Sequence, residues 1–138
     1  MTLKEIKHKF FAYRNGVVAD VLRRSGMPYK VIFGVDLPSL TYIARKTGYD
    51  SELAETLWAD RNVRESRLLA AYLFDPAELP IERALQLCED VQTSEEADIM
   101  AFRLLRHLPY RYQLSEQLKS TSSGALAVRA LEKHLQLS

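Results

Sequence analysis

Apolar residues recur three and four positions apart along most of this chain, and capping or helix-breaking residues interrupt them at short intervals. This spacing is typical of amphipathic helices, and no stretch of strand length alternates strictly between apolar and polar residues. Residues 25–38 form the one long irregular connection. Its apolar triplet at 31–33 has no second strand to pair with, so we expect a packed loop there. The pattern predicts an all-α fold.

The first predicted helix runs from about residue 3 to Arg14 and buries an apolar face. Asn15 and Gly16 weaken or kink this helix, and the apolar face is expected to continue to about Arg24. The residues expected on the two parts of the face are Ile6, Phe10 and Tyr13, then Val17, Val18, Val21 and Leu22.

Capping signals predict the starts of further helices. Three pairs have the spacing of a capping box, in which a short polar side chain and a Glu three positions later accept hydrogen bonds from each other's backbone amides. These pairs are Thr2 with Glu5, Asn62 with Glu65, and Thr93 with Glu96. Asp36, Asp50 and Pro80 are suitable residues to begin three more helices.

From residue 51 onward the predicted helices come in pairs, which begin near residues 51, 80 and 110. The period of roughly 30 residues is near the short end of helical-pair repeats. One amphipathic pair cannot bury its apolar stripe alone, whereas stacked pairs share a continuous core. We therefore predict an α-solenoid of stacked antiparallel helix pairs, HEAT-like or ARM-like, forming one domain over residues 1–138.

Charge and cysteine content narrow the classes of function. The chain has 19 basic and 18 acidic residues, so its net charge of +1 gives no global attraction to a polyanion, and only a local patch can provide one. The lone Cys88 rules out a disulfide within the chain and fits a reducing compartment. The first residues lack the apolar core of a signal peptide, and no run reaches membrane-spanning length. We expect a cytoplasmic protein with no membrane partner.

No metal or cofactor site is predicted. His8, His107 and His134 are dispersed, and the sequence has neither a Cys-x-x-Cys pair nor a glycine-rich phosphate loop. Cys88 falls on the apolar face of its predicted helix, as a small buried hydrophobe does, and Trp58 is expected in the core.

The second helix of each predicted pair carries two basic residues three or four positions apart, which places both on one helical face. The couples are Arg64 with Arg67, Arg103 with Arg106, and Arg129 with Lys133. Second helices of a solenoid usually line its concave surface, so the couples predict rows of cations suited to a polyanion. A solvated face is the alternative, because Arg103, Arg106 and Lys133 fall in predicted last turns, where the helix dipole favours cations. Arg64 and Arg67 favour the first interpretation, since the dipole does not explain cations in an opening turn.

A resemblance to the DNA alkylation repair proteins of the AlkD-like class is carried by residues 34–76, GVDLPSLTYIARKTGYDSELAETLWADRNVRESRLLAAYLFDP. The matching positions are Gly34, Val35, Pro38, Leu40, Leu57, Trp58, Arg64, Glu65, Arg67, Leu68, Leu69 and Ala70. With the flanking helices the resemblance covers most of the chain. It implies a HEAT-like solenoid whose concave basic surface grips duplex DNA, and the glycosylases of that class excise positively charged alkylated purines.

The active-site signature of that class is a Trp-Asp-x-x-Asp turn at a helix start, whose last Asp is the catalytic carboxylate. The corresponding segment here is DVQTSEEAD, with Ser94 at the Trp position, Glu95 at the first Asp and Asp98 at the last. The resemblance implies Asp98 as the candidate catalytic acid, and a first-turn acid favoured by the helix dipole is the alternative. Arg129 matches a DNA-contacting arginine that follows a tryptophan, but Trp58 is the only tryptophan in this chain.

Three interpretations stay open. The chain is a DNA-binding helical repeat protein, an active glycosylase for alkylated bases that uses Asp98, or a non-catalytic solenoid that binds a protein partner. Residues 110–112, Tyr-Arg-Tyr, are either a contact to a phosphate backbone or an ordinary corner between repeats. A homodimer formed through the apolar side of the last repeat, at Leu126, Leu131 and Leu135, is a further alternative.

Overall fold

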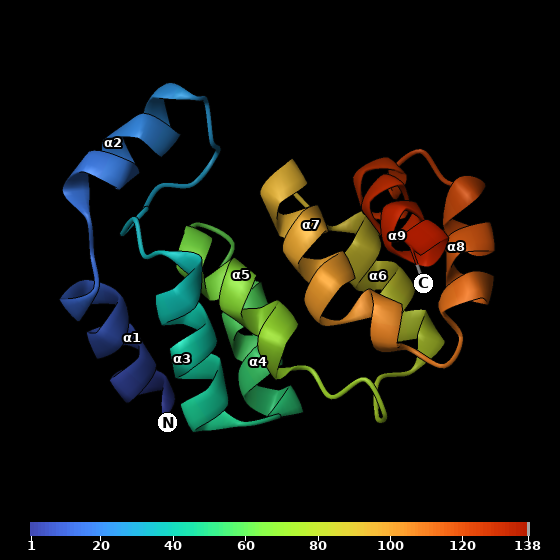
Figure 1. The fold of residues 1–138 in the computed structure, drawn as a ribbon, viewed down its shortest axis with the longest axis horizontal. Helices are drawn as coiled ribbons and strands as arrows, with labels where there is room; N and C mark the ends of the chain where they lie inside the picture. Colours follow the sequence, from blue (N-terminus) through green and yellow to red (C-terminus); the bar gives the residue numbers. More distant parts are fainter. Residues whose placement is uncertain (138) are drawn as a thin grey trace. The chain divides into compact units, whose positions relative to one another are not determined.

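Figure 1 shows the computed structural model, which describes the backbone of residues 1–137 and the side chains of residues 1–135. Over residues 1–137 the chain forms nine α-helices and one short 3-10 helix, and no strand is present there. The packed loop predicted within residues 25–38 is observed, with one isolated parallel bridge between Val31 and Val63. The all-α prediction is confirmed.

Two compact units make up the chain, Met1–Leu73 and Phe74–Ser138. The helices of the first unit are α1 (Leu3–Ala12), α2 (Gly16–Arg24), α3 (Leu37–Thr47), α4 (Ser51–Ala59) and α5 (Arg64–Leu73). In this unit α5 packs against α4 and α3. Its fully buried side chains include Ile6, Phe10, Leu40, Ile43, Leu57 and Leu69. The single domain expected over residues 1–138 stays a prediction.

Most of the predicted caps of the first unit are observed. Thr2 and Glu5 form the complete capping box at the start of α1. The side chain of Asp36 accepts a hydrogen bond from the amide of Ser39 at 2.8 Å, and this bond fixes the start of α3. Asp50 caps α4 in the same way, at 3.0 Å from the amide of Leu53. Each of these side chains satisfies an amide that has no partner within its own helix.

The junction of α1 and α2 differs from the prediction. Asn15 caps a separate helix, because its side-chain oxygen accepts hydrogen bonds from the amides of Val17 and Val18, at 3.1 and 3.2 Å. The inward face expected for this part of the chain is wrong at its three valines, whereas Leu22 is partly buried as expected. Val17 is 76 % exposed, and Val18 and Val21 are exposed too, whereas Ala19 is buried with Tyr29 and Ile32 of the following loop.

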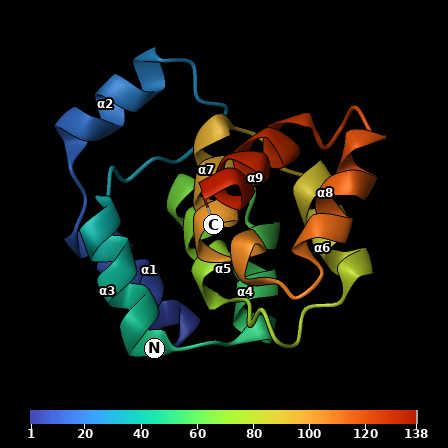
Figure 2. The same ribbon diagram turned by 45° about the vertical axis from the view of Figure 1, so that its right-hand side comes forward.

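The helices of the second unit are α6 (Ile81–Glu89), α7 (Ser94–Arg103), the 3-10 helix η1 (Leu105–His107), α8 (Arg111–Lys119) and α9 (Ala125–Leu137). In both views α7 lies beside α9, and α9 also packs against α8 and α6 (Figure 1, Figure 2). The single helix predicted up to Pro109 ends at Arg103, and η1 follows it. Arg103 and Arg106 therefore do not share one continuous helix.

Consecutive helices lie at all three positions predicted for pairs, and substantial packing between the two members is observed for the first and the third pair. The pairs are α4 with α5, α6 with α7, and α8 with α9, which begin at Ser51, Ile81 and Arg111. The predicted starts near residues 51, 80 and 110 are thus confirmed. None of the helices in the described part of the chain has the length and the apolar composition of a membrane span.

Candidate nucleic-acid interface

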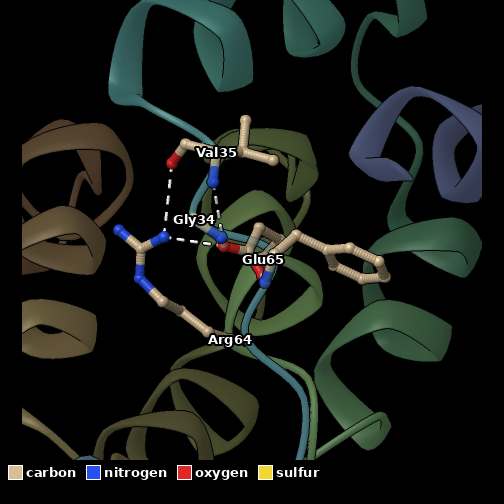
Figure 3. A network of polar contacts seen from close by, with 5 residues as sticks. Gly34, Val35, Arg64 and Glu65 are labelled. Atoms are coloured by element: carbon tan, nitrogen blue, oxygen red, sulfur yellow. Dashed lines mark hydrogen bonds and ion pairs between the residues drawn. The ribbon is translucent and has the colours of Figure 1, made fainter. Parts of the chain in front are cut away.

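Arg64 opens α5, where the helix dipole disfavours a cation, and the structure shows what compensates its charge (Figure 3). Its Nη1 atom donates hydrogen bonds to a carboxylate oxygen of Glu65 at 2.7 Å and to the carbonyl oxygen of Val35 at 3.2 Å. Arg64 as a whole residue is only 4 % exposed, so its positive charge is not accessible from solvent. The expectation that it lines an accessible basic row is wrong.

The Glu65 carboxylate is the centre of this network. It accepts hydrogen bonds from three successive backbone amides, those of Phe33 at 3.0 Å, Gly34 at 3.0 Å and Val35 at 3.3 Å. Glu65 is fully buried, so its charge depends on these donors and on Arg64 for stabilisation. The carboxylate thus joins the loop before α3 to the start of α5. The capping box predicted for Asn62 and Glu65 is wrong, because this carboxylate bonds the loop amides.

Gly34 allows the loop to pass this point. Its φ angle is 80°, a conformation that residues with a Cβ atom rarely adopt. A Cβ atom at Gly34 would lie 2.3 Å from the carbonyl oxygen of Asn15 and 2.9 Å from the amide nitrogen of Ala19. Only glycine fits between the Glu65 carboxylate and the backbone at the start of α2.

Arg67 is also buried, with 1 % of the residue exposed. Its guanidinium carbon lies 3.4 Å from the centroid of the Trp58 ring, and its Nη1 atom donates a hydrogen bond to the Trp58 carbonyl oxygen at 2.9 Å. Trp58 is itself buried, which confirms its predicted place in the core. The accessible position expected for Arg67 is therefore wrong, because this side chain joins α5 to the end of α4.

The sequence analysis did not predict that Arg64 and Arg67 are bonded within the fold. A cation in the opening turn of a helix indicates that an anion compensates its positive charge. This anion is either a ligand of the protein or an acidic residue nearby in the chain. Glu65, next to Arg64, is the signal that points to the second of these. Its bonds to the loop amides of residues 33–35 depend on a contact between distant parts of the chain, which helical spacing does not reveal.

The cations of the second unit are more accessible. Arg103 and Arg106 are half-buried, and both guanidinium groups lie over the ring of Phe102, with carbon-to-centroid distances of 5.0 and 4.1 Å. The Nε atom of Arg106 donates a hydrogen bond to the Phe102 carbonyl oxygen at 2.7 Å. The ring of His134 on α9 lies 5.6 Å from that of Phe102. Phe102, 40 % exposed, thus holds two arginines at the end of α7.

Arg111 and His107 extend this group of cations. Arg111 lies 4.8 Å from the ring centroid of Tyr112 and donates a hydrogen bond to the carbonyl oxygen of Leu108. The pKa of His107 is lowered below 6.5, first by partial burial and then by the positive charges of Arg106, Arg103 and Arg111. The three guanidinium groups consequently create a positive potential at one imidazole.

Residues 110–112 divide between two roles. The Tyr110 hydroxyl donates a hydrogen bond to the carbonyl oxygen of Leu79 at 2.5 Å, and burial raises its pKa to about 12. Tyr110 is therefore a structural contact within the second unit. Tyr112, by contrast, is 55 % exposed.

Arg129 and Lys133 are exposed and lie four residues apart on α9. This spacing places both on the same side of the helix, as the sequence predicts. Leu131 between them is fully buried, so it is not accessible to a second copy of the chain, and Leu126 and Leu135 are half-buried. The cationic pair on α9 has the accessibility that the pair on α5 lacks.

Asp98, the candidate catalytic acid, is exposed in the second turn of α7. The first-turn acids of this helix are Glu95 and Glu96, so the alternative of a first-turn dipole contact does not describe Asp98. Thr93 begins the helix as predicted, because its hydroxyl accepts a hydrogen bond from the amide of Glu96 at 3.1 Å.

Two further chemical predictions concern Cys88 and metals. Cys88 is fully buried, and burial raises the pKa of its thiol to about 12, as expected for an inert hydrophobe. Within the described part of the chain, no group of three or more potential ligand residues is arranged to hold a metal ion.

A family model described as DNA alkylation repair enzyme matches residues 6–129 of this chain. The match spans both compact units and includes Asp98 and most of the basic residues discussed above. No curated protein and no solved structure matches the chain.

Proposed function

Because this chain belongs to the DNA alkylation repair enzyme family, we propose that it acts on DNA and binds the duplex through basic residues of its second unit. The family supports a DNA-repair-like function. The contact residues proposed are Arg103, Arg106, Arg129 and Lys133. Arg64 and Arg67 are left out, since their positive charges are buried and bonded within the first unit.

The exposed pair Arg129 and Lys133 on α9 carries this proposal. Cations that contact phosphates must be accessible, and each one that displaces a counterion adds to the salt dependence of binding. Long basic side chains four residues apart on a helix span a length that fits adjacent phosphates without any change of fold. Arg103 and Arg106 add positive charge in the same unit.

Titration of a fluorescent DNA duplex over a salt series tests the proposal. We expect the logarithm of the association constant to fall linearly with the logarithm of the salt concentration. For the double variant Arg129→Gln/Lys133→Gln, the slope should be smaller in magnitude by about 2, because two phosphate contacts are lost. Circular dichroism should show an unchanged helix content, since both side chains are exposed.

Arg45→Gln/Lys46→Gln is the matched control, because this Arg and Lys are also exposed but lie on α3 of the first unit. We expect the wild-type salt slope for this variant. Equal losses in both variants, or no binding of the wild type at low salt, would contradict the proposal.

Excision of alkylated bases is a second candidate function, favoured by the position of Asp98. This carboxylate is one helical turn before the exposed ring of Phe102, so the two share a side of α7. A carboxylate in such a place stabilises positive charge that develops on a sugar during base loss, though exposure to water weakens the effect. Release of an alkylated purine from DNA, abolished in Asp98→Asn, would support excision, and equal release from both proteins would sink it.

A non-catalytic interaction with another protein is a third candidate, favoured by α2. Val17, Val18 and Val21 are exposed on this helix, and apolar side chains that cluster on a surface often mark contacts between proteins. Under this interpretation Val17→Ser/Val21→Ser would abolish binding to the partner and leave stability nearly unchanged. Self-association of the chain, measured by sedimentation, is the simplest form of the same test.

A further inference from the structure

Six residues between the end of α7 and the start of α8 form what we call the α7–α8 patch. They are Phe102, Arg103, Arg106, His107, Arg111 and Tyr112. This short segment combines three arginines with the rings of Phe102 and Tyr112, and each guanidinium group lies over one of these two rings. The effect of all three arginines on the pKa of His107 indicates that these groups are close enough to act together.

Arg106 and Arg111 each use one guanidinium nitrogen in a hydrogen bond to a backbone carbonyl. Among the described residues, Arg106 uses its Nε atom to bond the Phe102 carbonyl, and Arg111 uses Nη1 to bond that of Leu108. Their remaining N–H groups make no hydrogen bond within the described part of the chain. Guanidinium groups held in this way keep donors suited to the oxygen atoms of a phosphate.

The exposed rings distinguish this patch from a surface that contacts only phosphates. A duplex keeps its base faces stacked inside, so phosphate contacts to it need cations and no exposed rings. Unpaired nucleotides present base faces as well, and these stack on aromatic rings and on planar guanidinium groups. Phe102 is 40 % exposed and Tyr112 is 55 % exposed, so each residue is accessible from solvent although guanidinium groups lie over both rings.

We propose that the α7–α8 patch binds unpaired nucleotides of single-stranded nucleic acid, with bases stacked on Phe102 and Tyr112 and phosphates on Arg106 and Arg111. This inference rests on the proposed DNA function and adds a second ligand, single-stranded nucleic acid, to the duplex that α9 is proposed to contact. It assigns the rings a role of their own, independent of Arg129 and Lys133.

The experiment measures binding of a fluorescent oligothymidylate and of a duplex, on the same protein samples and at the same salt concentration. The variant Phe102→Leu/Tyr112→Leu removes both rings and keeps every charge. We expect its affinity for the oligothymidylate to fall by roughly tenfold or more, because each stacked base contributes a substantial part of such binding. The fall in duplex affinity should be several times smaller.

Tyr42→Leu/Tyr49→Leu is the matched control, because both tyrosines are exposed in the first unit and lie outside the patch. We expect wild-type binding from this variant. Arg106→Gln/Arg111→Gln removes charges and keeps the rings, and it should weaken both ligands and flatten their salt dependence. Circular dichroism of each variant shows that the helix content is retained.

The outcomes separate this inference from the proposed duplex function. Duplex binding without oligothymidylate binding would overturn the α7–α8 patch and leave the duplex proposal standing. Oligothymidylate binding that survives loss of both rings, or that falls equally in the control, would also overturn it. Binding of the oligothymidylate alone, lost with the rings, would support the patch and contradict the duplex proposal.

Discussion

The arginines of the two units have opposite environments, although the same helical spacing predicts both sets. Arg64 and Arg67 on α5 are buried, and they bond Glu65, a loop carbonyl and the end of α4. Arg103 and Arg106 in the second unit are half-buried and lie over the exposed ring of Phe102. Position on one helical face therefore does not decide whether a cation stabilises the fold or contacts a ligand. The burial of the side chain and the partners it finds inside the fold decide it.

The consequences of removing charge differ accordingly. A buried ion pair that loses one partner leaves an uncompensated charge in the interior, which is strongly destabilising. An exposed cation that is removed changes the surface potential and has little effect on stability. Substitutions of the buried and of the accessible charged residues test this difference.

Glu65→Gln should destabilise the protein by about 3–5 kcal/mol, because it leaves the buried Arg64 charge without its carboxylate. The neutral side chain also brings an amide N–H group toward backbone donors, which lowers its value as an acceptor for the loop. Urea denaturation followed by circular dichroism measures the change. Glu52→Gln, an exposed carboxylate of α4, is the control and should change stability by less than about 0.5 kcal/mol. Similar midpoints for the two variants would refute the buried pair.

Arg67→Met should destabilise the protein by about 2–3 kcal/mol, because the stacking on Trp58 and a charged hydrogen bond are both lost. Trp58 is the only tryptophan, so its fluorescence emission should shift as its surroundings change. The same substitution at Arg106 should cost only about 0.5–1 kcal/mol, because solvent screens its stack on Phe102 and its bond to the Phe102 carbonyl, and it should leave the emission unchanged. If Arg106→Met is as destabilising as Arg67→Met, the contrast between the units is wrong.

Arg106→Gln should raise the pKa of His107, since one of the nearby positive charges that lower it is removed. The imidazole of wild-type His107 binds its proton more weakly in the folded protein than in the unfolded chain. The neutral imidazole therefore stabilises the folded protein at a pH above 6.5. This contribution to the free energy of unfolding is lost as the pH falls from 6.5 through the lowered pKa of the folded state. Titration of the His107 ring protons by NMR measures both values. An unchanged pKa would show that Arg106 does not act on this imidazole.

Much of the fold could be predicted from short-range patterns. Thr2, Asp36 and Asp50 begin helices because a short polar side chain bonds an amide within three residues, and a local sequence is sufficient to show this. The consecutive helices that begin at Ser51, Ile81 and Arg111 follow from apolar spacing in the same way. The exposed valines of α2 were not predicted, because an apolar helical stripe indicates a face that can be buried and does not say whether a partner covers it.

The candidate site was predicted only in part. Arg129 and Lys133 are accessible as expected, because long basic side chains on a helix surface keep their charged ends in water. The burial of Glu65 depends on three loop amides about thirty residues earlier in the chain, and the arginine stack on Phe102 depends on where α7 ends. The first contact follows from tertiary packing and the second from the break in the helix after Arg103, and helical spacing alone predicts neither of them.

An amide NMR titration of the protein with duplex DNA would show directly which unit contacts the duplex. We expect the chemical shift changes to concentrate in residues 102–112 and around Arg129 and Lys133, while the amides near Arg64 and Arg67 keep their shifts. Changes concentrated at the start of α5, with the second unit unaffected, would contradict this expectation.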